Sequence, residues 1–541
     1  MIPELLQRYP IGSDITIMNT YYQRPIWEDG KKICDDFIVL VFKENKTGIK
    51  RRAILKKPNY TYYMSKPGTE LDYCQLYVDK NLVDEINVPF TDLLKDIAER
   101  TDNKEFWKNN IQSRNKEANE ELHKQPNVFF SDVNIEDHYR FKFAMNYTNN
   151  ITKLNKGFFD IETDIIDCPT DFPEKGNCPV NAVTFLDEKS DTSYTFLLRD
   201  PRNPLIQKFE DKIASGQFNL DTIRKFVEEH TRDKKGKSQL KKFGLENTDY
   251  KIKFYDDELQ LLKELFATMH ACSPDFIEGW NSSAFDLQFI IDRCYMLGED
   301  PVNVLCDQSW PVKVVRNYVD MKNYSNLPER GDYTFISGLP VFIDQEIQYA
   351  SRRKSKYGSI NSFKLDDTAW REAQIHKLDY HHITNDLGKL PRLDYETFVL
   401  YNIMDVIAQK AIEKKTQDLE YIFAKCVVNN TVYRKGHRQS VYLINRMASD
   451  WYKKGYIIGN NINRAAKKKP PRFPGAMVGE PTRTNDYAKH KIDGRMIWIC
   501  DNLQDYDKQY VAQARNGLLI NHLIAGKSRL DELQRNLKRS A

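Results

Sequence analysis

The spacing of hydrophobic and polar positions changes along this chain and divides it into three regions. In residues 1–150, short apolar runs at 37–42 and 51–55 flank a polar turn at 43–48, which predicts paired strands. Residues 92–125 are polar and favour helices. The first region is therefore predicted to be a β-rich amino-terminal domain.

Residues 151–425 alternate between the two periodicities that separate strands from helices. Short apolar runs predict strands at 157–162, 180–185 and 194–198, and longer patterns with helical spacing predict helices at 254–270, 284–297 and 394–416. This alternation is typical of an α/β domain with helices covering a sheet. The charged stretch 232–242 holds six cations in eleven residues, which favours a solvated surface insertion over a phosphate-binding segment.

The third region, residues 426–541, begins as a helical connector that continues to about 470, where lysines and two prolines interrupt the pattern. An apolar run at 496–501 predicts a strand that ends at Asp501, and we expect this strand to find no sheet partner in the chain. A basic tail follows.

Two acids on an apolar strand are the first candidates for chemistry. Asp160 and Glu162 are two residues apart, so they point to the same side of the predicted strand. Two carboxylates held so closely repel each other unless a cation lies between them. The same Asp-x-Glu spacing occurs at four other places, so the pair alone is weak evidence for a metal site.

Further acids follow at positions where helices are predicted. Asp286 precedes an apolar stripe and is expected on the opening turn of a helix. Tyr401 and Asp405 are four residues apart in a strongly helical segment, so they share one helical face. Four acids among 77 acidic residues would usually be solvated surface groups, and the order and apolar context of these four argue for a site.

Composition narrows the class of protein. A chain of 541 residues should hold two to four domains, and a net charge of +4 means that any surface for nucleic acid must be local. Nine cysteines without CxxC pairs argue against zinc and against a disulfide scaffold, and fit reduced thiols in a cytoplasm. No apolar stretch is long enough to span a membrane, so we expect a cytoplasmic protein, in the host cytoplasm if it is viral.

Three segments, FDIET at 159–163, NSSAFD at 281–286 and YNIMD at 401–405, resemble in this order the exonuclease motifs of family B DNA polymerases. The nearest resemblance is to the replicative polymerases of tailed bacteriophages. The segment RFPGAM at 472–477 is similar to the family motif that lies between the exonuclease and polymerase domains and touches the template. The resemblance implies a ribonuclease H-like 3′–5′ exonuclease domain at 151–425, followed by the start of a polymerase palm.

The resemblance also implies a reaction. Two Mg²⁺ ions, for which Mn²⁺ could substitute, would be held by Asp160, Glu162, Asp286 and Asp405 during hydrolysis of the terminal phosphodiester of a DNA strand. Tyr401 would orient the nucleophile together with Glu162. The residues expected to contact DNA are Asn281, Phe285, Arg352, Arg353, Phe473 and Gly475.

The resemblance ends in the palm. Asp501 and Tyr506 keep the spacing of the first palm motif, so Asp501 is a candidate palm metal ligand, but the later polymerase motifs are absent. This predicts the amino-terminal half of a divided polymerase, which would need a second polypeptide with fingers, palm and thumb for DNA synthesis. A stand-alone exonuclease and a non-catalytic DNA-binding scaffold are the alternatives. DNA, the second polypeptide and a sliding clamp are the expected partners.

Overall fold

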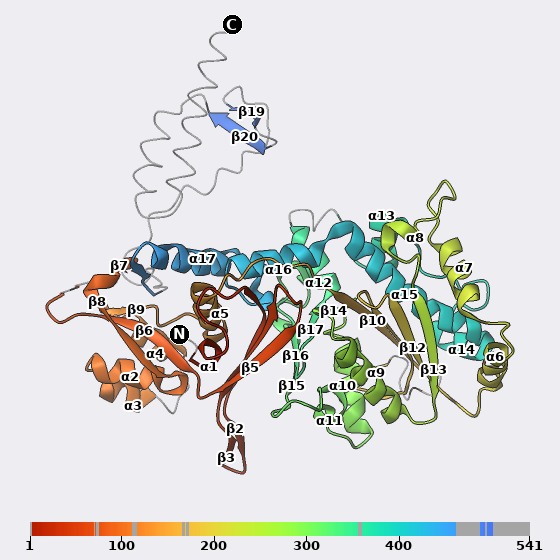
Figure 1. Ribbon diagram of the computed structural model, residues 1–541, viewed down its shortest axis with the longest axis horizontal. Helices are drawn as coiled ribbons and strands as arrows, with labels where there is room; N and C mark the ends of the chain where they lie inside the picture. The colour runs from red at the N-terminus through yellow and green to blue at the C-terminus, as the bar shows by residue number, and fades with distance from the viewer. Residues whose placement is uncertain are drawn as a thin grey trace, which may run out of the picture. The chain divides into compact units, whose positions relative to one another are not determined.

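The computed structural model describes residues 3–69, 71, 75–110, 116–164, 168, 173–354 and 360–460, and two strands at 487–492 and 495–500. The chain divides into two compact units, Met1–Ile462 and Asn463–Ala541. Figure 1 shows the first unit with its elements labelled.

The amino-terminal part of the first unit contains two small sheets, ordered β1-β4-β5 and β8-β6-β9. Their strands are β1 (Ile15–Gln23), β4 (Phe37–Glu44), β5 (Lys50–Lys56), β6 (Asn59–Ser65), β8 (Val83–Pro89) and β9 (Val128–Phe129). A separate hairpin is made by β2 (Ile26–Glu28) and β3 (Lys31–Cys34). The helices are α1 (Pro3–Leu6), α2 (Leu93–Arg100), α3 (Lys104–Asn110), α4 (Lys116–His123) and α5 (Ile135–Asn146).

Residues 37–42 form an unbroken apolar run because both faces of strand β4 are buried. Ile38, Leu40 and Phe42 belong to one hydrophobic core. Val39 and Val41 belong to another, on the opposite face of the strand. A strand that is buried on both faces has no polar side to alternate with. The predicted strands at 37–42 and 51–55 and the helices within 92–125 are confirmed.

The central element is a six-stranded sheet with the order β13-β12-β11-β10-β14-β17. Its strands are β10 (Lys156–Thr163), β11 (Val180–Asp187), β12 (Thr192–Leu198), β13 (Asp249–Tyr255), β14 (Phe276–Gly279) and β17 (Val341–Asp344). β10, β11 and β12 are antiparallel neighbours, whereas β14 and β17 run parallel to β10. This arrangement is ribonuclease H-like, with β13 added in parallel beside β12.

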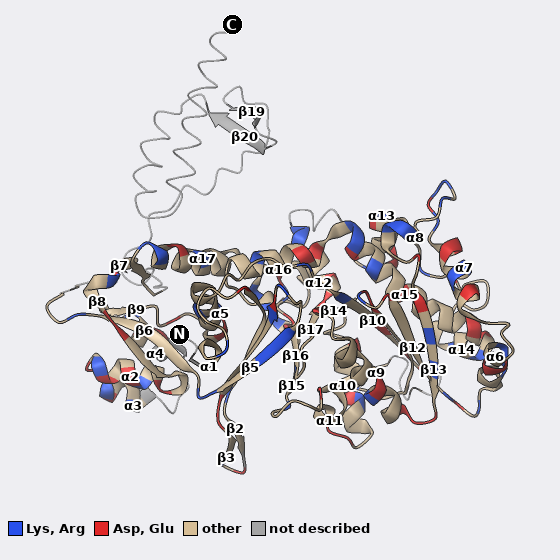
Figure 2. Ribbon diagram, viewed as in Figure 1, with Lys and Arg blue, Asp and Glu red and all other residues tan. Residues whose placement is uncertain are grey.

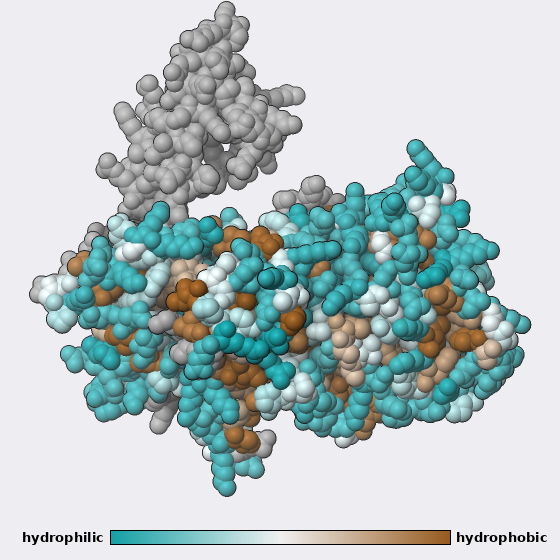
Figure 3. All heavy atoms as spheres, in the orientation of Figure 1, coloured by the Kyte–Doolittle hydropathy of each residue, from teal (hydrophilic) through white to brown (hydrophobic). Residues whose placement is uncertain are grey.

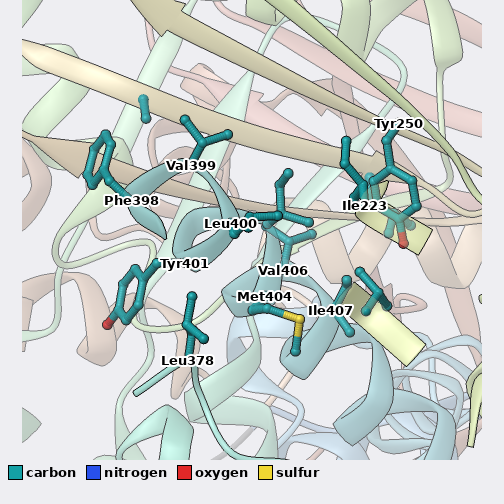
Figure 4. Close-up of a cluster of buried hydrophobic side chains, with 14 of the residues drawn as sticks. Ile223, Tyr250, Leu378, Phe398, Val399, Leu400, Tyr401, Met404, Val406 and Ile407 are labelled. Atoms are coloured by element: carbon teal, nitrogen blue, oxygen red, sulfur yellow. The ribbon is translucent and has the colours of Figure 1, made fainter. Parts of the chain in front are cut away.

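Helices pack against this sheet with separate hydrophobic cores. α9 (Glu258–Cys272) and α10 (Asp286–Met296) pack with Phe159, Ile161 and Phe185. α15 (Tyr395–Thr416) packs with Phe158 and Ala182. Figure 4 shows the second of these cores around α15, with Tyr401 and Leu378 among its labelled side chains.

The helix expected at 254–270 begins later than predicted. Residues 249–255 form β13, and the helix starts only at Glu258. The alternation of Tyr250, Ile252 and Phe254 with two lysines is a strand pattern, which the surrounding charge concealed.

Residues 204–243, which precede β13, contain three helices that contribute to the core. α6 (Pro204–Ala214), α7 (Leu220–His230) and α8 (Leu240–Phe243) bury apolar side chains against α15, among them Phe209 and Phe243. The cations of residues 232–242 are themselves exposed, as a solvated surface segment requires.

The first unit has further helices and strands. They are α11 (Pro301–Leu305), β15 (Val315–Tyr318), β16 (Tyr333–Ile336), α12 (Gln345–Arg352), α13 (Leu365–Ala373), α14 (Leu390–Leu393), α16 (Asp418–Val428), α17 (Gln439–Lys453), β18 (Tyr456–Ile458) and β7 (Tyr77–Asp79). β18 pairs with β7, so the end of the first unit returns to the amino-terminal part. The helical connector expected from residue 426 to about 470 is confirmed by α17, but residues 456–458 form a strand and residues 461–470 lie outside the described residues.

One expectation about the second unit is wrong. β20 (Arg495–Cys500) pairs in antiparallel register with β19 (Tyr487–Ile492), so the apolar strand does have a partner in the chain. The sequence Asp-Gly at 493–494 between two strand patterns is a hairpin signal that our interpretation of the sequence overlooked. Phe473, Gly475 and Asp501 lie outside the described residues.

In the part of the chain that the structure describes, no helix is long and apolar enough to cross a membrane. The face drawn in Figure 3 is largely hydrophilic, with hydrophobic residues in separate patches.

Candidate active site

Strand β10 sends its side chains alternately to two faces of the sheet. Phe159 and Ile161 enter the core beneath α9 and α10. Phe158 enters the core formed with α15, and Asp160 and Glu162 follow it on that face at intervals of two residues. The strand thus buries both of its apolar sides and leaves two half-buried carboxylates facing α15.

Helix α15 is fixed over this strand by polar side chains from one of its faces. The helix starts at a capped turn, where the Asp394 carboxylate accepts a hydrogen bond from the Thr397 backbone N–H. The Asn402 Nδ2 donates to the Asp160 Oδ2 at 3.3 Å. Two turns on, the Gln409 Nε2 donates to the Phe159 carbonyl at 3.2 Å. Asp405 lies between these two anchors, so they set its height above β10.

Asp160, Glu162 and Asp405 form a compact carboxylate group. One oxygen from each residue lies within 4.8 Å of the others. Asp405 is 2% exposed, and its Oδ1 is buried without a hydrogen-bond partner among the described residues. Three carboxylates with an unsatisfied buried oxygen fit the oxygen-rich coordination that divalent cations such as Mg²⁺ prefer.

Without a cation, the carboxyl groups of this cluster have raised pKa values. Burial, then the charge of Asp405, raises the pKa of Glu162 to about 8. Burial, and then Asp405 and Asp286, raise the pKa of Asp160 well above its ordinary value. A bound divalent cation would reverse this effect, because it stabilises the ionised carboxylates.

Lys377 is a member of the site that sequence reasoning missed. Its Nζ lies 2.5 Å from the Asp405 Oδ2 and 4.6 Å from the centre of the Tyr401 ring. Burial lowers the pKa of Lys377, but Asp405, Tyr401 and Asp160 more than offset burial, so its pKa is well above the ordinary value. Lys377 is therefore a permanent cation at the edge of the carboxylate group. No spacing in the sequence ties it to Asp405, so no signal could have found it.

Tyr401 lies one turn before Asp405, as its spacing predicted, and its ring meets that of Tyr380 edge-on with 5.5 Å between centres. Burial, then the charge of Asp405, raises the pKa of the Tyr401 hydroxyl above its ordinary value. The hydroxyl therefore stays protonated and can donate a hydrogen bond.

Asp286 is the first residue of α10, in agreement with the sequence prediction, and it is not one of the three residues whose carboxylate oxygens lie within 4.8 Å of one another. Its Oδ1 accepts a hydrogen bond from the Ile161 backbone N–H at 3.2 Å. It is thereby held beside the strand segment that separates Asp160 from Glu162. Burial raises the pKa of Asp286 to about 7.

The loop that leads to Asp286 is held by buried polar contacts. The Ser283 N–H donates to the Asp344 Oδ2 at 3.1 Å. The Asn317 Nδ2 donates to the Ser283 carbonyl at 2.8 Å and to the Gln288 Oε1 at 2.9 Å. Thr334 donates to the Asn317 Oδ1 at 2.6 Å. The loop therefore has little freedom to move Asp286.

Asn281 and Phe285, two expected DNA contacts, lie in this same loop. Asn281 has a left-handed backbone with φ of 58°, and its carbonyl accepts the Phe285 N–H at 3.0 Å. Such a conformation suits asparagine better than most residues. The Phe285 ring packs on Phe289 with centres 5.9 Å apart.

Arg352 and Arg353 are engaged elsewhere. Arg353 donates to the Asp418 Oδ2 at 2.7 Å, and the Arg352 Nη1 is 3.4 Å from the Asp418 Oδ1. Their guanidinium groups also lie over the rings of Tyr349 and Tyr421. These contacts join the end of α12 to α16, and none of them connects the arginines to the carboxylate group.

Comparisons with known proteins agree with this geometry. A family model described as DNA polymerase family B, exonuclease domain, matches residues 108–331. The match contains Asp160, Glu162 and Asp286, whereas Tyr401 and Asp405 lie beyond it.

Two curated relatives are phage enzymes named DNA-directed DNA polymerase. The chain is 24% identical over 359 residues to that of Escherichia phage RB69, which covers 64% of this chain and 34% of the relative. It is 25% identical over 317 residues to that of Enterobacteria phage T4, which covers 57% of this chain and 30% of the relative. The chain thus spans about a third of the length of the curated relatives it matches.

Proposed function

We propose that the chain is a metal-dependent 3′–5′ exonuclease, and the match of residues 108–331 to the family model of the exonuclease domain of DNA polymerase family B supports this proposal. It would act on the 3′ end of a DNA strand and release a nucleoside monophosphate. Its role would be to remove mispaired ends during replication. One observation carries the proposal. Three carboxylates from β10 and α15 meet within 4.8 Å on one face of a ribonuclease H-like sheet.

The residues present suit two divalent cations. Asp160, Glu162 and Asp405 would hold one, and Asp286, with Asp160, would serve a second. Mg²⁺ fits carboxylate oxygens, and Mn²⁺ accepts the same ligands. When bound, such ions lower the pKa of a coordinated water and stabilise the leaving oxygen.

The chain's own groups would position the reacting phosphate. Tyr401 would donate its hydroxyl hydrogen to the attacking water or to a phosphate oxygen. Lys377 would place a positive charge beside the phosphate, where negative charge develops during hydrolysis. Asn402 would keep the Asp160 carboxylate oriented through its hydrogen bond to Oδ2.

The test is digestion of an oligonucleotide labelled near its 5′ end, with and without Mg²⁺. A ladder that shortens one nucleotide at a time from the 3′ end supports the proposal, and an oligonucleotide with a blocked terminal linkage should stay intact. Binding of DNA without metal-dependent cleavage would favour the non-catalytic scaffold.

A second function concerns DNA synthesis. This chain would supply the exonuclease part of a polymerase whose fingers, remaining palm and thumb belong to another polypeptide. What supports this is the similarity of most of the chain to two DNA-directed DNA polymerases, together with a strand pair in the second unit that precedes Asp501. A sliding clamp would be a further partner of such an assembly. A stand-alone exonuclease is the alternative, and primer extension separates the two.

A further inference from the structure

A basic turn, residues 232–238, connects α7 to α8. Arg232 and Ser238 bridge in antiparallel fashion, and the Asp233 N–H donates to the Lys237 carbonyl at 3.0 Å. The Asp233 carboxylate accepts the backbone N–H groups of Lys235 and Lys237, each at 2.9 Å. The acid therefore closes the turn, and the side chains of the lysines extend outward from a defined backbone.

The lysines of the turn form no ion pair with other described residues. Lys234, Lys235 and Lys237 are exposed, and within the described residues no carboxylate lies at ion-pair distance from any of them. Figure 2 shows blue residues on the loop that projects near α8. A compact group of exposed cations is the kind of surface to which a phosphate backbone binds.

A chain of ring contacts links this turn to the carboxylate group. The Lys234 Nζ lies 4.9 Å from the centre of the Trp370 ring. Trp370 stacks on His376 with centres 4.2 Å apart and an interplanar angle of 15°. The next residue after His376 is Lys377, whose Nζ contacts Asp405. Neighbouring Cα atoms are about 3.8 Å apart, so the stack begins immediately beside the site.

A second stacked pair lies on the other side of Lys377. His381 stacks on Tyr380 with centres 4.9 Å apart, and Tyr380 meets the Tyr401 ring. Both histidines are exposed and face carboxylates, since His376 lies 3.2 Å from Asp366 and His381 lies 2.8 Å from Asp379. Aromatic platforms beside a cationic surface are how proteins bind single strands without reading their sequence.

We propose that the basic turn and these two stacked pairs bind the single-stranded end of the DNA that is digested, which rests on the proposed exonuclease function. The lysines would contact phosphates several nucleotides before the 3′ end, and the Trp370 and Tyr380 platforms would take bases nearer to it. The turn thus governs how firmly a strand is held, while the carboxylate group governs its cleavage.

The test compares two variants of the full chain with equal loss of charge. K234A/K235A/K237A removes the turn's lysines, and K31A/K46A/K95A removes three exposed lysines of the amino-terminal part. Binding of a single-stranded oligonucleotide is measured without divalent metal over a range of salt concentrations. Affinity falls with salt, and each phosphate contact contributes about 0.7 to the steepness of log affinity against log salt for single strands. Loss of three contacts should therefore make this slope shallower by about 2. The control should keep the original slope.

Cleavage gives the second readout. The turn variant should raise KM for a long oligonucleotide about tenfold with kcat unchanged, and it should hydrolyse the p-nitrophenyl ester of thymidine 5′-monophosphate normally. Equal slopes and KM values in both variants would overturn the proposal, as would a loss of ester hydrolysis in the turn variant. If the unmodified chain cleaves neither substrate, the exonuclease function itself fails, and the salt slopes still decide the role of the turn.

Discussion

Lys377 and Asp405 form a close ion pair, with 2.5 Å between Nζ and Oδ2, at the edge of the carboxylate group. The lysine comes from the segment after α13 and the acid from the middle of α15. Lys377 stabilises the ionised forms of Glu162 and Asp405, and so lowers the pKa values that burial raises. The site thus contains its own partial substitute for a metal cation.

Replacement of Lys377 by methionine should shift the pH dependence of cleavage. Without the lysine the carboxyl pKa values rise further, so the ionised acids that hold the metal appear only at higher pH. The acidic side of the plot of rate against pH should shift toward higher pH by about one unit, which lowers the rate near pH 7 about tenfold. Rates at saturating Mg²⁺ between about pH 6 and 9 check this. K377R keeps the charge and should therefore keep the pH dependence of the wild type. A K377M variant that is slower but has the pH dependence of the wild type would show that Lys377 acts on the substrate alone.

The double variant D160A/E162A should lose metal-dependent cleavage by about a thousandfold or more, because it removes two of the three grouped ligands. The fold should persist, since both side chains are half-buried at the sheet surface. The rate of mononucleotide release is the measurement. The variant D84A/E85A removes two exposed acids from β8 and serves as the control. Wild-type cleavage by D160A/E162A would place the active site elsewhere.

The metal-free protein should lose stability as pH rises. The pKa of Glu162 is about 8 in the folded chain against an ordinary value of 4.5. Between these two values the folded state binds more protons than the unfolded state, so the free energy of unfolding falls with increasing pH. The melting temperature in EDTA should therefore drop from about pH 5 to pH 8, and Mg²⁺ should raise it more at pH 8 than at pH 5.

The control for this effect is E162Q, which cannot titrate at that position. Its melting temperature in EDTA should depend less on pH and should exceed that of the wild type at pH 8 by about 1 °C per kcal/mol gained, as expected for a unit of this size. A wild-type melting temperature that rises from pH 5 to pH 8 without metal would contradict the raised pKa of Glu162.

Much of the fold followed from the sequence, because strand and helix periods are local properties. The alternation at 157–162 predicted that Asp160 and Glu162 share a face, and the spacing of Tyr401 and Asp405 predicted a common helical side; both are observed. β13 was missed because lysines alternate with its apolar residues, so charge concealed the pattern. The partner of β20 was missed because the Asp-Gly signal was passed over.

The meeting of these elements could not be derived from periodicity. β10 and α15 are brought together by tertiary contacts such as those of Asn402 and Gln409 with the strand, which span about 240 residues or more of chain. Lys377 reaches Asp405 from a segment without regular structure, so no period places it. The order of the motifs in a known family supplied the long-range information instead.

Asn317 should matter for cleavage although it lies outside the carboxylate group. The variant N317A leaves the Ser283 carbonyl and the Gln288 side chain without their donor, so it should lower the free energy of unfolding by about 1–2 kcal/mol. Because the loop then holds Asp286 less firmly, kcat should fall several-fold while the KM for DNA changes little. N323A removes another part-buried hydrogen bond from a side-chain amide, the one that Asn323 donates to Asp320, and should leave kcat unchanged. Equal kcat values in the two variants would show that the loop does not position Asp286.

The last prediction concerns synthesis. If a second polypeptide supplies fingers, palm and thumb, primer extension should appear only when it is mixed with this chain. Asp501→Ala should abolish extension, because a palm aspartate that holds the metal cannot be replaced by alanine without a loss of about a thousandfold. The same variant should digest single-stranded DNA at the original rate, since the carboxylate group of β10 and α15 is intact. D160A/E162A should behave in the opposite way, with extension kept and digestion lost. Extension that survives in D501A would show that Asp501 holds no metal, and the absence of extension in every mixture would favour the stand-alone exonuclease.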